Sequence, residues 1–179
     1  MSKIGKKFIQ IPAEVKIELA QGKAVVQGPK GSLEIVIPAS IEVKIEEGLA
    51  KVTRKNDQRQ TKAFHGLVRS LLNNAVIGVS QGYKKTLKLV GTGYRVTTKG
   101  KNLDLSVGYS HTVEFAPPDD VKVKVEGNDT IVIEGIDKQL VGEVSANIRK
   151  IKPPDAYKGK GIRYEDEVVK TKPGKTTSA

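Results

Sequence analysis

The sequence predicts an α+β fold made of two tandem copies of a small domain, each a mostly antiparallel sheet packed with one main helix. Two observations predict it. Shifting the chain by eighty positions aligns its halves without a gap from about residue 24 to residue 71. Each half also has the same order of patterns, short alternating strands followed by one amphipathic helix. So long a period indicates a duplicated domain, because solenoid repeats run about 20–50 residues.

Identical residues recur at this spacing through the alignment. The pairs include Gly28 and Gly108, Glu34 and Glu114, Pro38 and Pro118, Val43 and Val123, Lys44 and Lys124, Asp57 and Asp137, and Arg69 and Arg149. Two similar α+β patterns can also align by chance, but the gap-free register favours duplication. We expect the join near Ser80-Gln81-Gly82, which gives an N-terminal domain at 1–81 and a C-terminal domain with a basic loop and tail at 82–179.

The strands are predicted from alternation. Residues 41–45 and 121–125 alternate apolar and charged side chains, as in a strand with one face in water. Turns follow at Glu47-Gly48 and at residues 127–129. Further strands are expected at residues 24–27, 33–37, 50–53, 102–107, 112–115 and 130–133. Hairpin-length links between them indicate largely antiparallel sheets.

One helix closes each copy. Apolar residues from Phe64 to Val79 recur at helical spacing, and Asn56 or Asp57 is the expected N-cap. In the second copy the expected cap is Asp137, and Pro153-Pro154 end the helix. Packing against the adjacent sheets explains both apolar stripes better than a partner-binding surface does.

The net charge of +11 predicts a polyanion or a membrane surface as partner. The first ten residues hold three lysines and no acid, and residues 149–179 hold nine bases against four acids. Most of the excess charge therefore lies at the two ends, which we interpret as arms for an anion. No run of about 18 apolar residues is present, and no apolar stretch of a secretory signal follows the N-terminus. We expect a cytoplasmic protein.

The sequence offers little to a catalytic site. There is no cysteine, and the two histidines lie in different halves. His65 is most simply a helix-edge residue, and His111 is favoured as a plain turn residue over a contact to phosphate or base. The acidic runs Asp119-Asp120 and Glu165-Asp166-Glu167 are better explained as solvated charge than as a Mg²⁺ site. We predict no enzyme, no metal, no cofactor and no small-molecule substrate.

The segment after the second helix favours nucleic acid. Lys158-Gly159-Lys160-Gly161 places charged side chains on a backbone without Cβ atoms, which can approach phosphates closely. Tyr157 and Tyr164 flank it as stacking platforms for unpaired bases. The alternative is a flexible solvated loop anchored by its tyrosines. The asymmetry of charge favours the nucleic-acid interpretation.

This segment also resembles a known family. Residues 154–162, with the sequence PDAYKGKGI, resemble the signature of the bacterial large-subunit ribosomal protein six family. The opening residues 1–6, residues 28–31 and residues 135–139 match as well, so the resemblance covers essentially the whole chain. It implies a duplicated α+β fold and a structural, non-catalytic role in the large ribosomal subunit in translation.

The resemblance further implies binding to large-subunit (23S-type) ribosomal RNA near the base of the factor-recruiting stalk and the sarcin-ricin loop. Most RNA contacts would come from the second domain, with neighbouring large-subunit ribosomal proteins as further partners. Lys3 stands where relatives often have Arg, so a weaker phosphate contact is expected there. The residues expected to bind RNA are Lys3, Lys6, Lys7, Tyr94, Arg95, His111, Lys152, Tyr157, Lys158, Gly159, Lys160, Gly161, Arg163, Lys172 and Lys175.

One alternative from another class uses the same basic ends. A peripheral protein on an anionic membrane, or a protein adaptor, would also carry exposed positive charge. The sequence disfavours it because neither helix has the pattern of a basic amphipathic helix, and both apolar stripes face a core.

Overall fold

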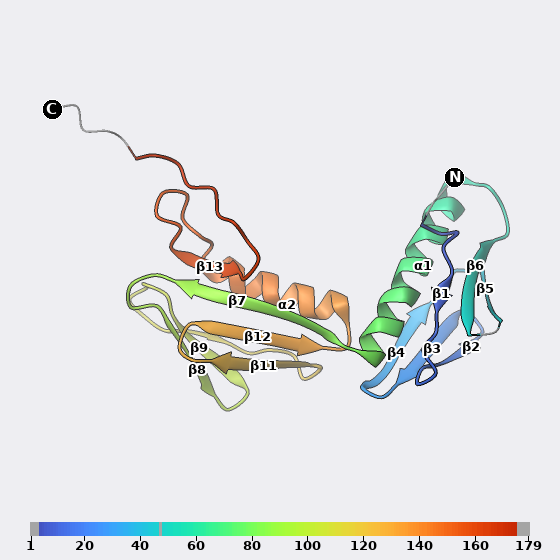
Figure 1. Ribbon diagram of the computed structural model, residues 1–179, viewed down its shortest axis with the longest axis horizontal. Coiled ribbons are helices and arrows are strands. Elements are labelled where there is room, and N and C mark those ends of the chain that lie inside the picture. Colours follow the sequence, from blue (N-terminus) through green and yellow to red (C-terminus); the bar gives the residue numbers. More distant parts are fainter. Residues whose placement is uncertain (1–3, 47, 175–179) are drawn as a thin grey trace. The chain divides into compact units, whose positions relative to one another are not determined.

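The chain, seen in a computed structural model, is described for residues 4–46 and 48–174 (Figure 1). It divides into two compact units. The first unit contains Met1–Tyr83 and Ile136–Lys138, and the second contains Lys84–Gly135 and Gln139–Ala179. Each unit has its own sheets, its own helix and its own apolar core.

In the first unit, one helix covers two small sheets. The elements are β1 (Ile9–Gln10), β2 (Lys16–Ala20), β3 (Lys23–Gly28), β4 (Gly31–Val36), β5 (Ile41–Glu46), β6 (Leu49–Arg54) and α1 (Arg59–Ser80). The strand orders are β1-β6-β5 and β2-β3-β4, and every pair is antiparallel. The helix buries Val68, Leu72, Val76 and Val79 against them.

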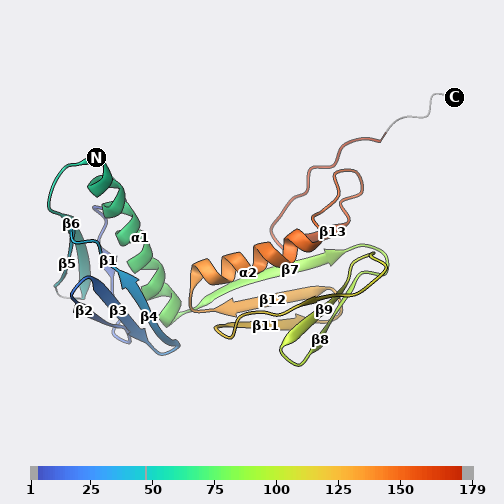
Figure 2. The same cartoon turned by 180° about the vertical axis from the view of Figure 1, so that it is seen from behind.

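The second unit repeats this order and extends it. Its elements are β7 (Tyr83–Val90), β8 (Arg95–Lys99), β9 (Asn102–Ser106), β10 (Val113–Phe115), β11 (Val121–Glu126), β12 (Thr130–Gly135), α2 (Lys138–Ile151) and β13 (Gly161–Tyr164). The strand orders are β10-β9-β8 and β11-β12-β7-β13. Figure 2 shows α2 along one face of the four-stranded sheet, with β13 beside β7.

The eighty-residue spacing maps the two units onto each other element by element. It superposes β5 on β11 and places β6, the start of α1 and the β2–β4 hairpins within a few residues of β12, the start of α2 and β8–β10. The helix α1 is longer, with 22 residues against the 14 of α2. The offsets arise in turns: two residues separate the paired Glu46 and Leu49, but three separate Glu126 and Thr130. The second unit differs by a long β7 where the first has the two-residue β1, and by β13.

All the predicted strands are confirmed, and five further strands were missed: β1, β2, β7, β8 and β13. The prediction that residues 161–164 belong to a loop is wrong. They form β13, which pairs antiparallel with β7 and buries Ile162 completely against Leu89 and its neighbours. The strands β1 and β13, of two and four residues, show too few alternating positions to be recognised from sequence.

The predicted N-cap of the first helix is wrong. Gln58 occupies the N-cap position of α1, and its side chain makes no capping hydrogen bond. Asp57 is engaged elsewhere, because Arg54 Nε donates to its Oδ1 at 2.7 Å. The boundaries predicted for the second helix are confirmed: α2 begins at Lys138, directly after Asp137, and ends at Ile151 before Pro153-Pro154.

An ion pair fastens the chain that follows β13 to α2. Arg149 donates from Nη2 to Oε1 of Glu167 at 2.6 Å and from Nε to Oε2 at 3.0 Å. The backbone N–H of Tyr164 also donates to Glu167, and the guanidinium lies 5.7 Å from the Tyr164 ring centroid. The Arg149 hydrogen bonds hold the pKa of Glu167 below its usual value. Arg149 was counted above among the bases of the C-terminal arm. Its charge is paired with Glu167 inside the second unit.

A first prediction concerns packing. A Cβ added at Gly28 would lie 2.8 Å from the Val79 carbonyl oxygen of α1, whereas one added at Gly142 of α2 would meet nothing within 4 Å. Gly28→Ala is expected to destabilise the protein by about 1–3 kcal/mol through overpacking. Gly142→Ala is expected to stabilise it by about 0.5–1 kcal/mol, since alanine is the better helix former. Urea unfolding followed by circular dichroism measures both, and equal effects of the two changes would contradict the packing.

A second prediction concerns pH. Because the folded pKa of Glu167 is lowered, its ion pair stabilises the fold above the carboxyl's ordinary pKa and is lost as the pH falls through the folded value. Glu167→Gln should therefore be less stable than the wild type at pH 7, with the difference shrinking toward pH 3. Unfolding measured at several pH values tests this, and a difference independent of pH would contradict it.

Candidate nucleic-acid interface

The segment between α2 and β13, residues 152–160, is called the basic loop here. Its backbone is closed by its own hydrogen bonds. Ile162 N donates to Lys152 O at 2.8 Å, Asp155 N donates to Lys160 O at 2.8 Å, and Gly159 N donates to Asp155 O at 3.0 Å. The loop therefore has a defined conformation, which the alternative of a flexible solvated loop does not describe.

Asp155 organises the turn at the tip of the basic loop. Its Oδ2 accepts hydrogen bonds from the backbone N–H groups of Lys158, at 2.9 Å, and Tyr157, at 3.1 Å. These hydrogen bonds, with that of Lys158 the strongest influence, lower the pKa of the carboxyl. From the sequence, Asp155 was recognised as an acid of the C-terminal segment and as part of the family signature, but not as the residue that fixes this turn. Its position after two prolines and before a turn is the signal of an Asx turn that could have found it.

The tip of the basic loop exposes its long side chains, whereas Gly159 in the loop and Gly161 at the start of β13 are buried. Tyr157 is 60% exposed, and Lys158 and Lys160 are exposed. Gly159 is buried with a φ of 67°, a conformation that side chains rarely adopt. Gly161 is buried too, and a Cβ there would lie 2.6 Å from the Pro153 carbonyl oxygen. Gly159 thus suits the backbone conformation of the turn and Gly161 the close packing on Pro153-Pro154, and their contact with RNA stays a prediction.

A second group of side chains, of which Tyr109 and His111 are exposed and Lys152 is half-buried, gathers at the end of α2. The Tyr109 hydroxyl donates to the carbonyl of Ile151 at 2.9 Å, and Lys152 Nζ lies 4.6 Å from the Tyr109 ring centroid. His111 stacks on the same tyrosine, with ring centroids 6.0 Å apart and planes 15° apart. We call these three residues, Tyr109, His111 and Lys152, the tyrosine cluster. Tyr109 was not among the residues expected from the sequence to bind RNA, although it adjoins Gly108 and lies near His111.

The other candidates of the second unit have different surroundings. The Tyr94 ring is half-buried and packs against Gly91 and Gly108, while Arg95 is exposed at the start of β8. Arg163 lies on β13, half-buried, opposite Lys88.

Tyr164 does not have the open ring expected of a stacking platform. It is half-buried, with Lys85 Nζ 5.4 Å from its ring centroid in addition to the Arg149 contact. The reason is that residues 161–164 form a strand rather than a free loop, so Tyr164 is held against α2 and β7.

The segment after β13 returns to the basic loop. Lys172 N donates to the carbonyl of Ala156 at 2.7 Å, and Figure 1 shows the two segments running side by side. The exposed Lys172 is thereby brought next to the basic loop. Lys3 and Lys175, also expected to bind RNA, lie outside the described residues.

Lys6 and Lys7 belong to the first unit, where the N-terminal arm, residues 4–8, is anchored. Arg69 of α1 donates from Nε to Lys7 O and from Nη2 to Phe8 O, both at 3.2 Å. Gly5 is buried directly on the His65 ring, so closely that a Cβ would lie 2.6 Å from Nδ1. Both lysines are exposed on a fixed backbone.

The prediction that His65 is a helix-edge residue is wrong. Its side chain is buried, with Nε2 at 2.9 Å from Val52 O and Nδ1 at 3.3 Å from Arg54 Nη1. Nε2 therefore donates to the carbonyl and Nδ1 accepts from the guanidinium, which describes a neutral ring built into the core.

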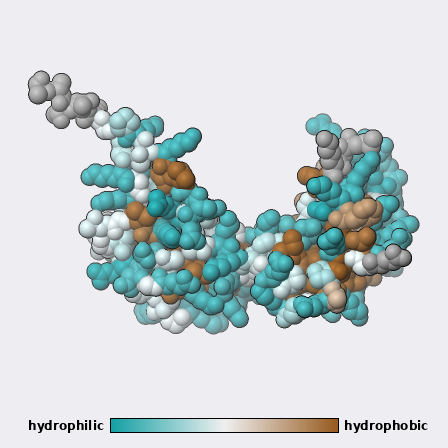
Figure 3. Space-filling view, viewed as in Figure 1, coloured by the Kyte–Doolittle hydropathy of each residue, from teal (hydrophilic) through white to brown (hydrophobic). Residues whose placement is uncertain are grey.

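The described residues contain no group of three or more His, Cys, Asp or Glu side chains arranged to hold a metal ion. Among the helices of residues 4–46 and 48–174, none has the length and apolar character needed to cross a membrane. The visible faces of both units are mainly hydrophilic (Figure 3).

Comparison with known proteins shows the family. The model of the family described as ribosomal protein L6 matches residues 11–82 and again residues 90–165, which confirms the duplicated α+β fold. The large ribosomal subunit protein uL6 of Staphylococcus carnosus is 48% identical over 176 residues, covering 98% of this chain and 99% of the relative. That of Thermodesulfovibrio yellowstonii is 51% identical over 177 residues, covering 98% of each.

A third relative agrees with these two. The protein of the same name from Nostoc is 46% identical over 176 residues, covering 98% of this chain and 97% of the relative. These matches span nearly the whole of both chains, and they confirm the resemblance to a ribosomal, non-enzymatic family. The chain belongs to the ribosomal protein L6 family.

Proposed function

We propose that this chain is a cytoplasmic structural component of the large ribosomal subunit that binds large-subunit ribosomal RNA through its second unit. The observation that carries the proposal is the basic loop, in which Asp155 fixes a turn that presents Tyr157, Lys158 and Lys160 to solvent. The relatives are named as large ribosomal subunit proteins.

The basic loop and the tyrosine cluster form one candidate surface, because Lys152 belongs to both. Lysines on this surface neutralise phosphates and release counterions, which gives affinity that depends on salt. Tyr157 and Tyr109 offer aromatic faces on which unpaired bases stack. Since the loop is already folded by its own hydrogen bonds, less conformational entropy is lost on binding.

The resemblance to the family supports a finer proposal for the site on the ribosome. We place the surface near the base of the factor-recruiting stalk and the sarcin-ricin loop, beside other large-subunit proteins. The domain boundary that we propose, 1–81 and 82–179, assigns the basic loop, the tyrosine cluster and Lys172 to the C-terminal domain. Lys3, Lys6 and Lys7 then supply a separate basic contact from the N-terminal domain.

The third prediction removes the two exposed lysines of the basic loop. Lys158→Ala with Lys160→Ala should weaken binding to large-subunit RNA roughly tenfold and reduce the slope of log affinity against log salt by about 1.5, as expected for two lost phosphate contacts. Filter binding at several salt concentrations measures both quantities. The matched control is Lys99→Ala with Lys122→Ala, which removes the same charge from exposed positions on β8 and β11. An unchanged slope in the loop variant, or equal losses in the two variants, would contradict the assignment.

The fourth prediction separates loop geometry from charge. Asp155→Ala removes a negative charge, which by electrostatics alone should strengthen RNA binding, but it also removes the acceptor for two backbone N–H groups. We expect binding to weaken about threefold to tenfold. Asp155→Asn keeps an acceptor oxygen and should bind at least as tightly as the wild type.

Asp166→Ala serves as the control for charge, because Asp166 is an exposed acid of the same unit beyond β13. It should bind RNA as tightly as the wild type or more so. Tighter binding by Asp155→Ala, equal to that of Asp166→Ala, would show that the turn is not needed.

A further inference from the structure

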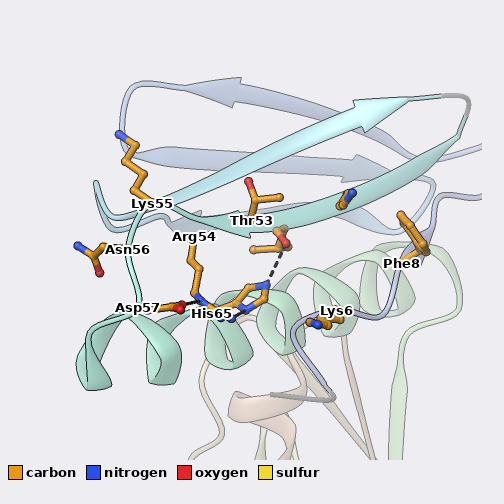
Figure 4. Close-up of a pocket in the computed structure, with 10 residues that line it drawn as sticks. Lys6, Phe8, Thr53, Arg54, Lys55, Asn56, Asp57 and His65 are labelled. Atoms are coloured by element: carbon orange, nitrogen blue, oxygen red, sulfur yellow. Dashed lines mark hydrogen bonds and ion pairs between the residues drawn. The ribbon is translucent and has the colours of Figure 1, made fainter. Parts of the chain in front are cut away.

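The first unit has a basic pocket of its own, which shares Lys6 with the contacts assigned above. A cavity of about 590 Å³ lies between the N-terminal arm, β6 with the turn that follows it, and α1 (Figure 4). Lys6 and Phe8 line it from the arm, and Lys51, Arg54 and Lys55 line it from β6 and the turn. Asp57 is the one acidic residue among the lining side chains of the described cavity.

The acidic residue of this pocket, Asp57, is already paired with a positive charge. Asp57 Oδ1 accepts a hydrogen bond from Arg54 Nε at 2.7 Å, and this contact lowers the pKa of the carboxyl. Lys55 Nζ is 3.9 Å from Glu42, a distance at the limit of an ion pair, and both side chains are more than half exposed. Exposed pairs of this kind contribute little, so Lys55 can exchange its partner for a ligand anion at small cost. The pocket therefore carries an excess of positive charge.

The floor of the pocket is rigid. Arg54 is held between Asp57 and the buried His65, whose other ring nitrogen is bonded to Val52 O, as the dashed lines of Figure 4 show. The Arg54 side chain is only 16% exposed. The arm above it is fixed by Arg69 and by the seat of Gly5 on His65. A ligand would enter a site that is already shaped.

An aromatic ring stands at one end of this pocket. Phe8 is 55% exposed, although it is a large apolar side chain, and Lys51 Nζ lies 5.8 Å from its ring centroid. A small inorganic anion would make no favourable contact with such a ring, and an apolar ligand would make none with the lysine charges. Cations beside an exposed aromatic face match one nucleotide, with its phosphate on the lysines and its base on the ring.

We propose that this pocket binds an unpaired nucleotide of RNA, so that the first unit holds RNA independently of the basic loop. The proposal rests on the proposed function for the nature of the RNA, but it assigns a different unit and different residues. It concerns Phe8, Lys51 and Lys55, none of which the sequence singled out, because they come together only when β6 and the arm pack on α1.

The fifth prediction tests this site in the full chain. Lys51→Ala with Lys55→Ala should weaken binding to large-subunit RNA about fivefold and reduce its salt slope by about 1.5. Lys16→Ala with Lys23→Ala removes the same charge from the other sheet of the same unit and should change neither value. Equal effects of the two double variants would overturn the proposal that the pocket binds RNA.

Phe8→Leu separates stacking from charge. It keeps an apolar side chain but removes the aromatic face, and it should weaken RNA binding about threefold to tenfold without altering the salt slope. Unchanged affinity would overturn the stacking contact. A control with inorganic phosphate as competitor distinguishes the ligand: displacement of RNA from the pocket by millimolar phosphate alone would overturn the nucleotide in favour of a small-anion site.

The two proposals fail separately. If the Lys158 and Lys160 variant loses affinity while the Lys51 and Lys55 variant does not, the pocket is overturned and the RNA-binding function of the second unit stands. Loss in the Lys51 and Lys55 variant alone supports the pocket and contradicts the basic loop.

Discussion

Each unit of this protein has a single helix to cover its sheets, and the packing of that helix determines where everything else lies. The helix buries an apolar stripe of Val, Leu and Ile against strand residues such as Val26, Val52, Leu87 and Ile133, so aliphatic side chains make up most of the core. In the second unit α2 also determines where the chain leaves the core. Pro153-Pro154 end the helix, the basic loop follows, and the chain returns as β13 to the edge of β7. The loop is therefore held at both ends by regular structure.

The two copies share a fold but differ in their exposed chemistry. The elements that the second unit adds, a long β7 and β13, create the frame for the basic loop, and the described residues of the first unit contain no counterpart of β13. The first unit instead packs its N-terminal arm across α1. Glycines show the same divergence: Gly28 packs on α1, whereas its counterpart Gly108 has a φ of 79° and contacts Tyr94. The duplication produced two units with the same fold, and these units differ in the segments at their ends, namely the N-terminal arm in the first and β13 with the basic loop in the second.

Much of the fold could be predicted because its patterns are local. Alternation over five or six residues and helical spacing from Phe64 to Val79 are visible in the sequence, and so is the repeat. The short strands could not be predicted, since β1 and β13 are defined by their partners rather than by their own residues. The same limit explains the ion pair: Arg149 and Glu167 are 18 residues apart, and only the fold shows that they meet.

The candidate site was predictable to a similar extent. Exposed Tyr157, Lys158 and Lys160 follow from composition, while the role of Asp155 requires the hydrogen bonds of the turn. The tyrosine cluster and the pocket of the first unit depend on long-range packing, as does the burial of His65. The distribution of charge along the sequence therefore showed that the basic residues lie near the chain ends, but it did not show which side chains form a common surface.

The most direct test of the central claim is ultraviolet crosslinking of the full chain in assembled large subunits, followed by identification of the crosslinked peptides. The account predicts adducts within the basic loop, at Tyr157 above all, and at the tyrosine cluster. RNA adducts confined to other surfaces of the second unit, with none on residues 152–160 or on Tyr109, would contradict it.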